Sequence, residues 1–148
     1  MADIATFHKL LQLKETDKNV AHKIYQESIE EFEQVATTMY ELLKKKEQAE
    51  EYYQHQLQQS TQVTELHMTH NYIEQLNKQI TQMQSSVQEA RNHMENKQEE
   101  LTFAHVEMKK YEKIIDRKEH NLYSLQMENE KKQMDEISMQ QFISQGNR

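Results

Sequence analysis

Apolar residues recur through the second half of the chain at alternating intervals of three and four positions. One row of every seventh residue runs from Ile73 to Ile143, and a companion row runs from Leu76 to Met139. Most positions in both rows are apolar, and the spacing is kept without a shift over the whole stretch. An apolar repeat with a mean period of 3.5 residues is typical of α-helices that pack as coiled coils. We therefore predict one long helix whose two rows, called the seam below, face a partner helix.

The first half of the chain carries a second, less regular seam in a different phase. Its rows begin at Ile4 and Phe7, and lysines interrupt both of them. Counting in sevens from Tyr53 leads to Ser60 and His67, whereas the second seam requires an apolar residue one position earlier, at Leu66. The shift predicts a break at residues 57–63, where Ser60 and a neighbouring threonine are suited to cap a new helix.

These two seams predict an all-α fold, in which two long helices form an antiparallel coiled-coil hairpin over a single domain of residues 1–148. Helix one is expected at about 4–57, the turn at about 57–63 and helix two at about 63–144, because helices joined by a short connection fold back on each other. Residue 4 would then lie opposite about residue 116. The last ~28 residues of helix two would extend beyond helix one as an overhang of about 40 Å, at 1.5 Å per residue.

The composition agrees with a thin helical structure rather than a globular one. Hydrophobic residues make up 35% of the 148-residue chain, there is no proline, and the single glycine is Gly146. Such a chain cannot build a wide core, yet it lacks the proline and glycine content of disordered segments. The formal net charge of −7 and the acids beside each lysine cluster argue against a nucleic-acid partner. No cysteine, secretory signal or apolar stretch of membrane-spanning length is present in the sequence, so we predict a cytoplasmic protein.

No constellation of residues predicts catalysis, a metal site or a cofactor. His67 and His70 have a spacing that can bind a metal from one helix face, but the sequence identifies no third ligand for them. Adjacent carboxylates such as Glu99 and Glu100 are numerous, but acid–base catalysis requires a cleft that two helices do not form. We therefore predict a protein that acts through partners and is a monomer when alone.

Three stretches, in this order along the chain, carry a resemblance to a known family. The first is Phe-His-Lys-Leu-Leu-Gln-Leu-Lys-Glu at 7–15, the second is Tyr-Ile-Glu-Gln-Leu at 72–76, and the third is Lys-Gln-Met-Asp-Glu-Ile at 132–137. Together they span the chain, and it resembles the flagellar FliJ proteins. The resemblance implies a non-enzymatic component of the bacterial flagellar type III protein export apparatus, with roles in flagellum biogenesis and motility.

The resemblance also implies partners and binding residues. Members of that family form a stalk in the hexameric export ATPase, contact the cytoplasmic domain of the export gate protein, and in some cases bind escort chaperones. Location at the inner face of the cell membrane would follow from these partners. The family pattern of the gate-binding face is matched here by Leu42, Tyr72 and Leu76, whereas Lys45 and Ala49 stand where some members have tyrosines.

The overhang suits a stalk that enters a narrow pore, so we place the ATPase contact there. The residues expected to bind the ATPase ring are Leu122, Leu125, Lys132, Asp135, Glu136 and Met139. Two alternatives remain open from the residues. One is the equivalent subunit of a virulence type III secretion system or of a rotary ATPase, and the other is a homodimeric coiled-coil tether.

Overall fold

Two long helices make up the computed structural model, which describes residues 3–146. Helix α1 spans Ile4–Gln58 and helix α2 spans Val63–Gly146, and the part of the chain that the structure describes holds no strand. Both helices begin and end within two residues of the predicted positions. The residues group into two compact units: a hairpin unit, Asn19–Thr102, and a tail unit formed by Met1–Lys18 with Phe103–Arg148. The predicted all-α antiparallel fold is confirmed, whereas the single domain stays a prediction.

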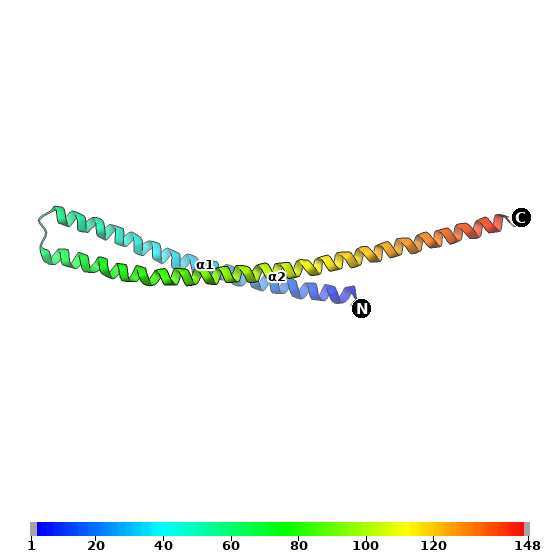
Figure 1. The fold of residues 1–148 in the computed structure, drawn as a ribbon, viewed down its shortest axis with the longest axis horizontal. Helices are drawn as coiled ribbons and strands as arrows, with labels where there is room; N and C mark the ends of the chain where they lie inside the picture. The colour runs from blue at the N-terminus through cyan, green and yellow to red at the C-terminus, as the bar shows by residue number, and fades with distance from the viewer. Residues whose placement is uncertain (1–2, 147–148) are drawn as a thin grey trace. The chain divides into compact units, whose positions relative to one another are not determined.

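In the hairpin unit, α1 and α2 run antiparallel on either side of the turn (Figure 1). The Tyr53 ring lies 6.4 Å from the His70 ring, and farther from the turn the Arg91 guanidinium lies 5.8 Å from the Phe32 ring. The buried residues of this unit, Ser28, Ala49, Gln56, Leu76 and Ile80, all occupy predicted seam positions. The heptad pattern therefore identified the packed faces of both helices correctly.

The turn at residues 59–62 is closed by hydrogen bonds rather than by a glycine. The Thr61 hydroxyl donates to the Gln56 carbonyl at 3.0 Å, so Thr61 satisfies the C-terminal end of α1 instead of capping α2 as predicted. Gln62 precedes the first residue of α2, and its carbonyl accepts from the backbone N–H of Glu65 and Leu66. Among the residues described, none has a positive φ. Helices often end in a glycine with a left-handed conformation, which lets backbone N–H groups bond the last free carbonyls. Here the Thr61 side chain satisfies one of these carbonyls instead.

In the tail unit, residues 3–18 pack against the part of α2 that ends near Glu119. The Lys118 ammonium lies 4.9 Å from the centre of the Phe7 ring, and the Lys14 ammonium lies 5.8 Å from that of Tyr111. These lysines sit at seam positions, where their aliphatic stems can pack while the charged ends face an aromatic ring of the other helix. These two interruptions of the apolar rows are therefore part of the packing between α1 and α2.

The contacting pairs are displaced from the predicted ones. In each contacting pair that involves an aromatic ring, the two residue numbers have a constant sum, which is 123 for the pairs of the hairpin unit and 125 for the two lysine–aromatic pairs of the tail unit. The predicted pairing has a sum of about 120. Side chains lean toward the N-terminus of their own helix, which is away from the turn on α1 and toward the turn on α2. A side chain of α1 therefore meets a residue of α2 that lies farther from the turn than simple counting gives. The prediction that residue 4 lies opposite residue 116 is therefore wrong by about five residues in side-chain contact.

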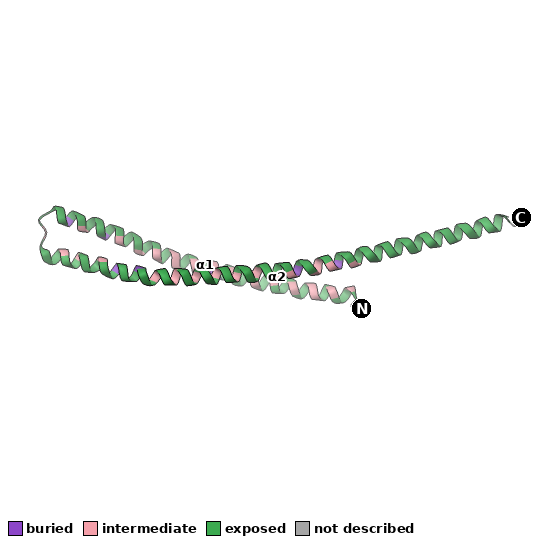
Figure 2. Cartoon of the chain, viewed as in Figure 1, coloured by how far each residue is buried: buried purple, intermediate pink, exposed green. Residues whose placement is uncertain are grey.

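The overhang consists of residues 119–146, all of which are exposed (Figure 2). It begins opposite the N-terminal turns of α1, where His8 Nε2 lies 3.6 Å from Glu119 Oε1. The preceding residue, Lys118, is the last described residue that is even partly buried. Over these residues α2 continues as a single helix within the tail unit. The length of the overhang, 28 residues, agrees with the predicted ~28 despite the displaced pairing, because the helix ends two residues later than expected.

Candidate partner-binding surfaces

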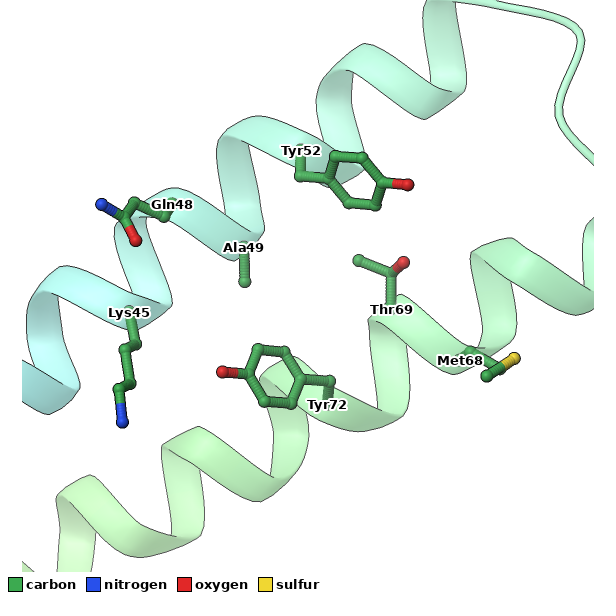
Figure 3. A pocket seen from close by; sticks show the side chains of 7 residues that line it. All are labelled: Lys45, Gln48, Ala49, Tyr52, Met68, Thr69 and Tyr72. Carbon is green, nitrogen blue, oxygen red and sulfur yellow. The ribbon is translucent and has the colours of Figure 1, made fainter.

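A groove between α1 and α2 in the hairpin unit contains one of the predicted gate-binding residues. The groove has a volume of about 430 Å³. Side chains of both helices line it (Figure 3): Lys45, Gln48, Ala49 and Tyr52 of α1, and Met68, Thr69 and Tyr72 of α2. Ala49 is small and buried, so the two tyrosine rings stand around a hollow rather than a filled layer. Tyr52, Met68 and Tyr72 are 57%, 68% and 47% exposed, and they form an apolar rim to which another protein can bind.

The three predicted gate-binding residues have different positions. Tyr72 lines the groove, Leu42 is partly buried, and Leu76 is only 3% exposed. The side chain of Leu76 belongs to the core between the helices, so in the folded hairpin it supports the surface and does not form it. The prediction of these residues as a binding site stays untested.

Tyr52 and Met68 were not predicted as part of this surface, although a signal for them exists in the sequence. Both residues are large and apolar, and both fall outside the rows that form the seam. Large apolar residues that gather at positions where solvent-facing polar side chains are usual make a candidate partner-binding surface. Lys45 and Ala49, which depart from the family pattern, line the same groove.

The six residues predicted to bind the ATPase ring all lie on the overhang. Leu122, Leu125 and Met139 are 54%, 55% and 65% exposed, and Lys132, Asp135 and Glu136 are exposed as well. The overhang thus presents apolar side chains to water over about 40 Å of helix, at 1.5 Å per residue. A helix with this much unpaired apolar surface favours a bound partner.

The two histidines whose spacing could suit a metal, His67 and His70, have different surroundings. His70 lies 3.1 Å from Glu74 one turn along α2 and beside the Tyr53 ring, while His67 is exposed. Within residues 3–146, no group of three or more histidine, cysteine or carboxylate side chains is arranged to hold a metal ion. Over the same residues, neither helix is apolar enough along its length to cross a membrane.

One carboxylate of the tail unit has a shifted pKa. Lys110 donates a hydrogen bond to Glu107 at 2.9 Å, which holds the pKa of Glu107 below its ordinary value. Glu107 and Lys110 therefore form an ion pair, and the lowered pKa keeps the Glu107 carboxylate ionised at neutral pH. A carboxylate in this state is unsuited to proton transfer near neutral pH.

Comparison with known proteins gives a consistent result over the whole chain. The family model described as "Flagellar FliJ protein" matches residues 4–147. A protein of Bacillus subtilis (strain 168) named "Flagellar FliJ protein" is 38% identical over 141 residues, which are 95% of this chain and 95% of that protein. No solved structure matches the chain. The match includes both helices, the turn and the overhang.

Proposed function

Because the chain belongs to the flagellar FliJ family, we propose that it is a non-enzymatic component of the flagellar type III protein export apparatus. In this proposal it acts as a stalk in the hexameric export ATPase and links the ATPase to the membrane export gate. Family membership over nearly the full length supports the flagellar system over a virulence secretion system and over a generic tether.

The observation that carries the stalk role is the overhang. A single helix with exposed apolar side chains, at the end of a two-helix structure, has the width that a ring with a narrow pore can accept. We expect the purified chain to bind the hexameric export ATPase and to raise its rate of ATP hydrolysis. Isothermal titration and a coupled ATPase assay measure the two effects, and no binding at micromolar concentrations would contradict the stalk role.

The gate-binding role is supported by the groove around Tyr72. The groove lies in the hairpin unit and the overhang in the tail unit, so the two proposed partners have separate surfaces. Escort chaperones are proposed as further partners, and a cytoplasmic location at the inner face of the membrane follows from binding to the gate.

Tyr72→Ala is expected to weaken binding to the cytoplasmic domain of the gate about tenfold, or ~1.4 kcal/mol, as for an aromatic residue in an interface. Because Tyr72 is 47% exposed, the thermal midpoint should change by no more than about 2 °C, as is usual for surface substitutions. Titration calorimetry and circular dichroism measure the two quantities.

The matched control for this variant is Phe103→Ala, which removes an exposed aromatic ring of the tail unit, away from the groove. It should bind the gate as the unaltered chain does. Equal losses in both variants would mean that the loss does not come from the groove.

A further inference from the structure

The overhang carries a second apolar stripe that does not belong to the seam. Its members are Tyr123, Met127, Met134 and Ile137, which recur at intervals of four, seven and three residues and are 61%, 50%, 68% and 53% exposed. They occupy two of the three heptad positions farthest from the partner helix, and these two are called the outer positions below. Coiled coils place polar residues there because such positions face water.

The stripe appears only in the part of α2 that extends past the N-terminal start of α1. Of the 14 outer positions between residues 73 and 120, only Val106 is apolar. Of the six outer positions between 123 and 141, four are apolar, and the exceptions are Glu130 and Gln141. The change coincides with the start of the overhang at residue 119, so the new pattern is not required for packing of α1 on α2.

In the middle of the overhang, polar and charged residues replace apolar ones on the seam face. Asn129, Lys132 and Glu136 hold three consecutive seam positions between Leu125 and Met139, and Glu128 and Asp135 flank them. At 100° per residue this charged sector is on the side of the helix roughly opposite the stripe. Met127 and Met134 border an open groove on α2 together with Glu128, Glu130 and Lys131. In the middle of the overhang the apolar residues therefore lie at the outer positions and the charged residues at the seam. In the rest of α2 the arrangement is the reverse.

A second copy of the chain is a poor occupant for this stripe. The overhang has five acidic and two basic side chains, a net charge of −3, so two overhangs would repel each other. Each copy would also contribute only four apolar residues, with Glu130 desolvated between them, and so short a helical contact is marginal in water. The net negative charge is instead complementary to a partner that surrounds the overhang and offers an apolar groove on one side and basic side chains on the other.

We propose that the overhang makes its apolar contact with the export ATPase ring through one face only: the stripe packs into an apolar groove of the pore wall, while the acidic side chains on the other side of the helix meet basic residues across the pore. This inference rests on the proposed function and moves the main apolar contact from Leu122, Leu125 and Met139 to the stripe. It also makes the apolar contact one-sided. Apolar packing then joins the stalk to a subset of the six ATPase subunits at any moment.

The deciding variant is the full-length chain with Met127→Gln and Met134→Gln, since glutamine is polar and still favours a helix. We expect unchanged helicity and at least tenfold weaker binding to the hexameric ATPase by titration calorimetry. The matched control is Phe103→Gln with Val106→Gln, which replaces two exposed apolar residues of α2 outside the overhang and should bind as the unaltered chain does.

A seam-face variant, Leu125→Gln with Met139→Gln, separates the two faces of the overhang. We expect it to bind more tightly than the stripe variant, and the reverse order would overturn the inference while leaving the stalk role intact. If the unaltered chain did not bind the ATPase, the proposed function would fail first. Sedimentation that showed a dimer broken by the stripe variant, with ATPase binding unchanged, would assign the stripe to a second copy and overturn the inference.

Discussion

A chain that ends at Glu119 is expected to keep the antiparallel packing of α1 on α2 and to lose binding to the export ATPase completely. The deletion removes residues 120–148, and no described residue among them is even partly buried. The contacts that close the tail unit, from Phe7 to Lys118 and from His8 to Glu119, remain in the shortened chain. Stability should therefore change little, because the free energy of folding comes from the burial that the deletion leaves intact.

Circular dichroism and the two ATPase measurements test this deletion together. The helical signal should fall only by the share of the removed residues, and the unfolding midpoint should stay within about 3 °C of that of the full chain. Stimulation of ATP hydrolysis should be absent. Retained stimulation would place the ATPase contact on the packed part of α1 and α2, and a loss of helicity throughout the chain would mean that α2 must reach its end for the pair to fold.

The fold could be read from the sequence because a coiled coil is specified by local spacing. The rows that include Phe32 and Ile80 are enough to place these residues on the packed faces, since a period of 3.5 keeps the repeated positions on one side of each helix. The break near Ser60 was found from the one-residue change of phase together with residues suited to cap a helix. A wide core would have required long-range contacts that spacing does not encode.

The details that were wrong depend on three-dimensional geometry. The displaced pairing of Lys118 with Phe7 follows from the lean of side chains along each helix, which counting from the turn ignores. The role of Thr61 follows from which of two helix ends its hydroxyl reaches. Threonine is suited to cap the following helix, so the sequence alone favoured α2.

The predicted binding residues stay untested, and the sequence reasoning behind them did not separate surface positions from seam positions. Leu76 was assigned to the gate-binding face by family resemblance, although the seam pattern also placed it in the core. Tyr52 and Met68 lie outside the seam, and so do the stripe residues of the overhang. We therefore expect exposed large apolar residues outside the coiled-coil seam to be the better sequence signal of a partner surface in this chain.

Leu76→Ala is expected to lower the free energy of unfolding by about 2–5 kcal/mol, the range for buried leucine truncations. Leu76 is 3% exposed in a core that is only one side chain deep, so the cavity cannot be filled from a second layer. Such a loss is a large part of the stability of a small protein, typically about 5–15 kcal/mol. Urea unfolding followed by circular dichroism measures this loss of stability.

At a temperature where the Leu76→Ala variant is still folded, the variant should bind the export gate nearly as the unaltered chain does, in contrast to Tyr72→Ala. If Leu76→Ala unfolded like the unaltered chain and failed to bind the gate, Leu76 would be a surface residue and the register of the hairpin would have to be shifted.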